Sequence, residues 1–150
     1  MSSAVCAKLL ILFAAVVLMA AALSAIGLWR AVAKQQPAET ITAWRNAVAL
    51  PGAMGIFMLS MAAVRPAIYM GEVADTLLVW SLAASGTALA MSWPVAAITG
   101  EHGLSPRMNF LNLYVYGGNV VGVVGAITGC VIILIGAFRS ALELLETGGF

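Results

Sequence analysis

The chain has 150 residues, of which 63% are hydrophobic and only 9% are charged. A soluble globular domain carries roughly 25% charged residues, because its surface must face water. The composition therefore excludes a soluble globule and indicates a protein whose solvent is lipid. The net charge of +1 provides no basic surface for nucleic acid. This length suffices for one domain, residues 1–150.

Four long stretches of the sequence carry no charged residue. They cover residues 9–29, 47–64, 76–100 and 108–138. A helix needs about 20 apolar residues to cross a bilayer. We therefore predict an all-α integral membrane protein, with four transmembrane helices in a bundle at residues 8–30, 47–65, 72–97 and 112–140.

The first apolar stretch also fits a secretory signal peptide, since Lys8 precedes it and small residues end it at Ser24. We expect it to be retained as the first span. Residues 30–46 contain Pro37 and charges of both signs, so we expect a polar loop there. The first and third loops share one side and hold four basic residues, against three on the side of the termini and the second loop, which favours both termini outside.

The second turn and the start of the third span carry charges that we expect to pair. Arg65 precedes Pro66, and a residue before proline disfavours helix, so the chain should turn here. Glu72 and Asp75 share a face in the first turn of the next helix, where carboxylates favour the positive end of the helix dipole. Pairing with Arg65 is the simpler interpretation, and an ion or proton site is the alternative.

The third span carries small residues at four-residue spacing, Ala84, Ala88 and Ser92. This face is the natural partner for any small-residue face on a neighbouring helix. Pro94 lacks a backbone N–H, so we expect it to kink or end the helix near Ala90.

Glycines form the strongest pattern in the chain. The last span places five of them at spacings of four, three, four and seven, on one helix face: Gly118, Gly122, Gly125, Gly129 and Gly136. Lipid removes the hydrophobic drive between helices, so association depends on close contact, which small residues permit. We predict that these glycines form a helix-packing face, within the chain or against another copy.

Polar candidates for chemistry are few. His102 is the single histidine, and Cys6 and Cys130 lie far apart. These residues build no typical zinc or bis-histidine haem site, so we expect no cofactor and no metal on them. Asn119 lies beside the glycine face; with Glu72 and Asp75 it is a possible polar path, although cross-helix hydrogen bonding is the simpler role.

No nucleophile with a partner base is visible, so the sequence favours a non-catalytic membrane subunit. We expect it to pack with other subunits or with copies of itself in a multi-pass membrane complex. One alternative is a small oligomeric channel or transporter whose path lies between protomers. A weaker alternative is a membrane enzyme that holds an anionic lipophilic substrate at the interface with Arg30, Arg45 and Tyr114.

Overall fold

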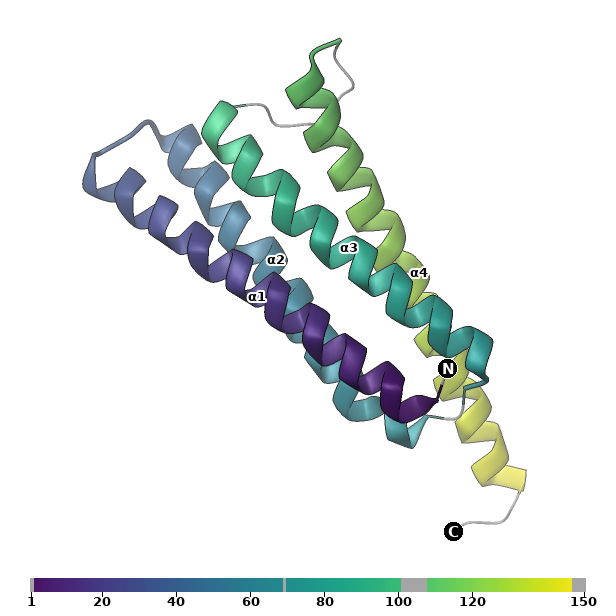
Figure 1. Cartoon of the computed structure of the whole chain (residues 1–150). Helices are drawn as coiled ribbons and strands as arrows, with labels where there is room; N and C mark the ends of the chain where they lie inside the picture. Colours follow the sequence, from purple (N-terminus) through teal and green to yellow (C-terminus); the bar gives the residue numbers. More distant parts are fainter. Residues whose placement is uncertain (1, 69, 101–107, 147–150) are drawn as a thin grey trace.

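The computed structural model describes residues 2–68, 70–100 and 108–146, and these form four long helices (Figure 1). They are α1 (Ser3–Ala33), α2 (Ala38–Val64), α3 (Glu72–Thr99) and α4 (Phe110–Glu146), with a short 3₁₀ turn, η1 (Arg65–Ala67), after α2. All four are long and apolar enough to span a bilayer. The predicted all-α bundle and multi-pass membrane location are confirmed.

The helices run longer than the predicted spans, most clearly at the start of α2. That helix begins at Ala38 after Pro37, whereas the sequence indicated a loop as far as residue 46. Glu39 in its first turn favours the helix dipole, and a helix continues beyond the hydrocarbon wherever its residues permit it. The connection from α1 is correspondingly short, with Gln35 in the left-handed region at φ 49°.

Proline does not end α3. The helix continues through Pro94 to Thr99 and stops at Gly100, whose φ of 73° is the left-handed conformation typical after a helix. The helix therefore does not end near Ala90, and the alternative outcome, a kink there, stays a prediction. A proline removes one backbone hydrogen bond, but leaving the helical conformation in lipid would leave several backbone groups without partners.

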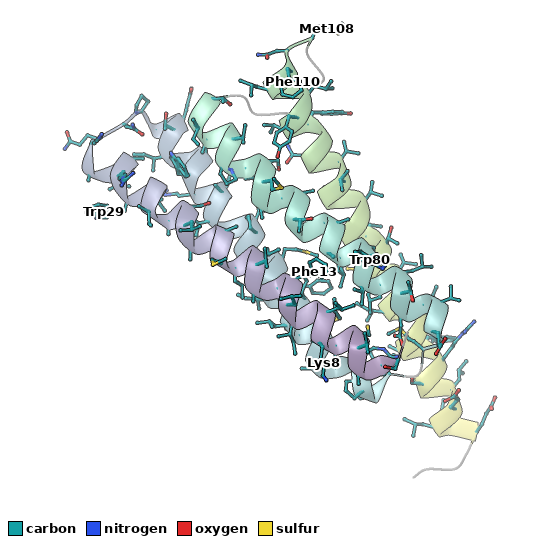
Figure 2. All side chains as sticks on the ribbon, viewed as in Figure 1. Lys8, Phe13, Trp29, Trp80, Met108 and Phe110 are labelled. Carbon is teal, nitrogen blue, oxygen red and sulfur yellow. The ribbon has the colours of Figure 1, made fainter. Side chains whose placement is uncertain are left out.

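The packing of the four helices is uneven. Helix α1 lies along α2 and α3, and Figure 1 shows α4 on the far side of α3. Within the described residues, no Cα atom of α4 comes within 8 Å of α1 or α2. The core lies among the first three helices and contains Leu10, Val17, Met58, Leu78 and Leu82. Figure 2 shows Phe13 of α1 against Trp80 of α3, with ring centroids 6.0 Å apart.

Consecutive helices run in opposite directions, so residues from different helices meet at each end of the bundle. The start of α1 and the end of α4 lie at one end of the bundle, and the α1–α2 turn, the end of α3 and the start of α4 lie at the other (Figure 1). We call these the terminal end and the loop end. Trp29 and Phe110 lie at the loop end, and Lys8 lies toward the terminal end (Figure 2). The position of a polar residue between these two ends decides which other polar residues can share a site with it.

Candidate functional site

The three residues of the possible polar path do not lie together. Asn119 is one residue from Gly118, which packs against Ser92 near the loop end. Asp75 lies 17 residues before Ser92 on α3. At ~1.5 Å rise per residue the two levels are separated by ~25 Å. Glu72 lies one turn further toward the terminal end, so these carboxylates and Asn119 belong to different regions.

At the terminal end, Asp75 forms a buried ion pair with Arg65. Asp75 is 2% exposed; Arg65 Nε donates to its Oδ1, and Nη2 donates to Oδ2 at 2.5 Å. Arg65 also donates to the carbonyl oxygens of Ile68 at 2.5 Å and Met70 at 3.3 Å. The predicted pairing with Arg65 is thus observed for Asp75. A guanidinium that is paired with a carboxylate and also donates to two backbone carbonyl oxygens fixes the turn between α2 and α3.

Along the α3–α4 contact, four glycines approach α3 closely. A Cβ added to Gly118 would lie 2.5 Å from Ser92 Cβ, and one added to Gly125 would lie 2.5 Å from the carbonyl oxygen of Ser81. Gly122 and Gly129 receive the side chains of leucines from α3 in the same way. Ser85 Oγ donates a hydrogen bond to the Gly122 carbonyl oxygen at 2.5 Å. The buried hydroxyl of Ser85 is therefore satisfied across this contact, whereas that of Ser92 has no hydrogen-bond partner among the described residues.

Beside this contact, toward the loop end, an apolar groove of about 600 Å³ lies between α2, α3 and α4. Ligand pockets are commonly about 300–1,000 Å³ and mostly apolar, with a few placed polar groups. Besides Gly122, the apolar residues that line the groove are Leu50, Leu89, Val120, Val123, Val124 and Ala126. Leu50 is the contribution of α2, and α4 supplies most of the rest.

Three hydrogen-bonding side chains line the same groove, Trp93, Tyr116 and Asn119. The Trp93 Nε1–H is buried and has no hydrogen-bond partner among the described residues. Tyr116 and Asn119 are half-buried and lie one helical turn apart on α4. A buried N–H without a partner costs free energy, and Trp93, whose side chain lines the groove, carries such a group.

The other large cavity, about 590 Å³, has a different character. It lies at the terminal end and is lined by Arg65, Ser3, Ser140 and Glu143, together with residues of the α2–α3 turn. Its charged and hydroxyl groups suit a polar ligand or water. The groove near the loop end differs from it in combining a mostly apolar surface with three residues that can donate hydrogen bonds.

The predicted absence of metal ligands concerns three residues. His102 lies outside the described residues. Cys6 is buried in the core and Cys130 is exposed on α4. Within the described part of the chain, no three His, Cys, Asp or Glu side chains are grouped to hold a metal ion. The expectation that His102 and the cysteines ligate nothing stays a prediction.

Comparison with known families decides the class of protein. The family model described as styrene oxide isomerase matches residues 4–138, nearly the whole chain. The chain belongs to the styrene oxide isomerase family. No curated protein and no solved structure matches the chain. The matched range covers α1 from residue 4, α2 and α3 completely and α4 up to Phe138, so it includes every residue that lines the groove.

Family membership corrects the main functional prediction. Styrene oxide isomerases are membrane-bound enzymes that convert an epoxide to an aldehyde, so the prediction of a non-catalytic subunit and the lean against an enzyme are wrong. The weaker alternative, a membrane enzyme for a lipophilic substrate, agrees with the family. The residues named for it, Arg30, Arg45 and Tyr114, are exposed and do not line the groove, and their role stays a prediction.

The reason for this error is chemical. No nucleophile with a partner base is visible in the sequence. Isomerisation of an epoxide is redox-neutral and adds nothing to the substrate, so it needs no such nucleophile. Trp93 and Tyr116 lie on the adjacent helices α3 and α4, and the packing of these helices brings them into one groove. The position of each residue within its own helix did not predict that both would line the same groove.

Proposed function

We propose that this protein is a membrane-bound isomerase that converts a lipophilic aryl epoxide, such as styrene oxide, to the corresponding aldehyde. We further propose that the groove lined by Trp93, Tyr116 and Asn119 is its active site. The match of residues 4–138 to the styrene oxide isomerase family is the observation that carries the proposal. The neutral, mostly apolar groove supports it, because the substrate is itself neutral and apolar.

The reaction can be written entirely within the substrate. The C–O bond at the benzylic carbon breaks, and its electron pair goes to the oxygen. A hydride then moves from the neighbouring CH₂ carbon to the benzylic carbon, while an oxygen lone pair forms the C=O bond. No atom enters or leaves, so the enzyme must stabilise developing negative charge on oxygen and positive charge on the benzylic carbon.

The groove offers groups for both charges. Trp93 N–H, Tyr116 O–H and the Asn119 amide N–H are donors that can hold the epoxide oxygen as its charge grows. Preorganised donors of this kind contribute most in a site from which water is excluded. The aromatic rings of Trp93 and Tyr116 carry negative faces that favour a nearby cation.

Exclusion of water determines the product. A benzylic cation that meets water gives a diol, whereas one held away from water completes the hydride shift. Leu89, Val123 and Val124 present hydrocarbon to the groove and offer no hydroxyl or carboxylate that could attack. A groove lined by no charged residue among those that the structure describes therefore suits this chemistry.

The glycine face has a part in this proposal. Gly122 leaves room for the Leu89 side chain, whose Cδ2 would lie 2.6 Å from a Cβ at that position. We infer that the glycines hold α4 close to α3 and so set the width of the groove. The helix-packing role of Gly118, Gly122, Gly125, Gly129 and Gly136, and association with copies of this chain, remain predictions.

The test is turnover by the purified protein in lipid vesicles. Styrene oxide is supplied, and phenylacetaldehyde and the diol are separated and measured by gas chromatography. Vesicles without protein, and vesicles with heat-denatured protein, give the background. We expect aldehyde formation above both backgrounds and no protein-dependent diol. Aldehyde at background level for several aryl epoxides would overturn the proposal.

A further inference from the structure

The groove is open on one side, and the opening lies between α2 and α4. Leu50 of α2 and Val123 of α4 line opposite edges, yet no Cα atom of α4 comes within 8 Å of α2 among the described residues. Leu50 is 40% exposed and Val123 is 56% exposed. In a multi-pass membrane protein, these edges face the acyl chains of the bilayer.

The depth of this opening follows from helix register. Asn119 lies six residues after Leu113, where the apolar part of α4 begins, and Trp93 lies seven residues before Gly100, where that of α3 ends. At ~1.5 Å per residue, both donors lie ~9–10 Å inside the apolar stretch. Because the hydrocarbon layer is ~30 Å thick, they lie within it, below the headgroups.

The groove is polar at its shallow end and apolar at its deep end. Tyr116, Asn119 and Trp93 lie toward the loop end, whereas Leu89, Val124 and Ala126 lie further toward the bilayer centre. A small molecule with one oxygen and one aryl group takes the same orientation in a membrane, with oxygen toward the headgroups. The bilayer therefore orients such a molecule to match the groove before it binds.

We propose that the substrate enters this groove laterally from the hydrocarbon layer, between α2 and α4, and that the aldehyde leaves by the same opening. The ligand class is then a neutral aryl compound with a single oxygen function that partitions into lipid. This inference rests on the proposed function for the identity of the ligand. The opening itself follows from the positions of α2 and α4, and a fluorescence measurement that needs no turnover tests it.

The test uses the fluorescence of Trp93 in vesicles whose phospholipids carry bromine on the acyl chains, because bromine quenches a nearby indole. The difference between the wild type and Trp93→Phe isolates the signal of this residue. Trp80, 58% exposed on the outside of α3, gives the lipid-facing reference through Trp80→Phe. 2-Phenylethanol, a neutral aryl compound with one oxygen, is the competing ligand.

We expect Trp93 to lose fluorescence in brominated lipid to an extent approaching that of Trp80. Added 2-phenylethanol should restore the Trp93 signal and leave that of Trp80 unchanged. A Trp93 signal equal in brominated and ordinary lipid would overturn lateral opening, and so would quenching by iodide in the water instead. Lipid quenching that 2-phenylethanol does not relieve would overturn lateral entry of the ligand. Failure of turnover with these signals intact would refute the proposed reaction and not the opening.

Discussion

The indole N–H of Trp93 is the most informative single group in the protein. It is buried, belongs to a residue that lines the groove, and has no hydrogen-bond partner among the described residues. In the proposed reaction it donates to the epoxide oxygen, and its contribution grows as the C–O bond breaks. Its effect should therefore appear in kcat more than in KM.

Replacement of Trp93 by Phe tests this role, because the variant keeps an aromatic ring and removes only the donor. Loss of one donor from a preorganised site costs about 10²–10³ in kcat in well-studied hydrolases, and we expect a decrease approaching that range. Trp80→Phe is the matched control, since Trp80 lies outside the groove. Steady-state kinetics in vesicles is the measurement. Equal kcat for both variants would remove Trp93 from the mechanism.

Asp75 illustrates a charge whose role is structural. It is almost fully buried and engages Arg65 through both carboxylate oxygens. Asp75→Asn leaves the Arg65 charge buried without its counter-ion, which typically costs about 3–5 kcal/mol. We expect a large fall in the thermal unfolding temperature in detergent.

Glu72→Gln is the control for this change, because Glu72 lies in the same first turn of α3 and is exposed. It should shift the unfolding temperature little. An apolar replacement of both partners, Arg65→Met with Asp75→Leu, should recover much of the loss. Unfolding of Asp75→Asn at the wild-type temperature would show that the pair contributes nothing to stability.

At the scale of the helices, the contact between α3 and α4 depends on where each glycine faces. Gly125 lies against the backbone of α3, so a methyl group there meets the Ser81 carbonyl oxygen. Gly117, on the same helix, has nothing within 4 Å of an added Cβ. These two positions separate the packing function of glycine from its poor helix propensity.

Alanine at the two positions should therefore act in opposite directions. Gly125→Ala should destabilise by about 1–3 kcal/mol, because the backbone of α3 cannot yield easily. Gly117→Ala should be neutral or stabilise by up to about 1 kcal/mol through better helix propensity. Thermal unfolding in one detergent compares them, with Gly122→Leu, Gly125→Leu and Val124→Leu as larger steps. Equal stability of the two alanine variants would mean that the glycine face does not pack.

The helices could be predicted from sequence because lipid permits few structures. A charge-free stretch of about 20 residues spans a bilayer as a helix, and the pairing of Arg65 with Asp75 follows from charges on either side of one short turn. The start of α2 and the passage of α3 through Pro94 could not be predicted in this way, since hydropathy marks the hydrocarbon and not the helix ends. The groove depends on which residues of α2, α3 and α4 share a depth, and no local pattern specifies that.

The arrangement of the whole molecule suits the proposed reaction, which must proceed without water. Helix α4 stands beside α3 away from α1 and α2, and the groove it leaves lies within the hydrocarbon layer. A lipophilic epoxide is concentrated there and water is scarce. The same lack of charge that excludes a soluble fold suits an enzyme whose intermediate is a carbocation.

In the proposed reaction, the substrate rearranges internally in this groove. Styrene oxide carrying two deuterium atoms on its CH₂ carbon tests this internal rearrangement, with the product analysed by mass spectrometry. We predict phenylacetaldehyde that retains both deuterium atoms, one on the aldehyde carbon and one on the benzylic carbon, because the hydride moves without exchange. Three results would contradict an internal rearrangement: protein-dependent formation of the diol, aldehyde that has lost deuterium to water, or no protein-dependent aldehyde.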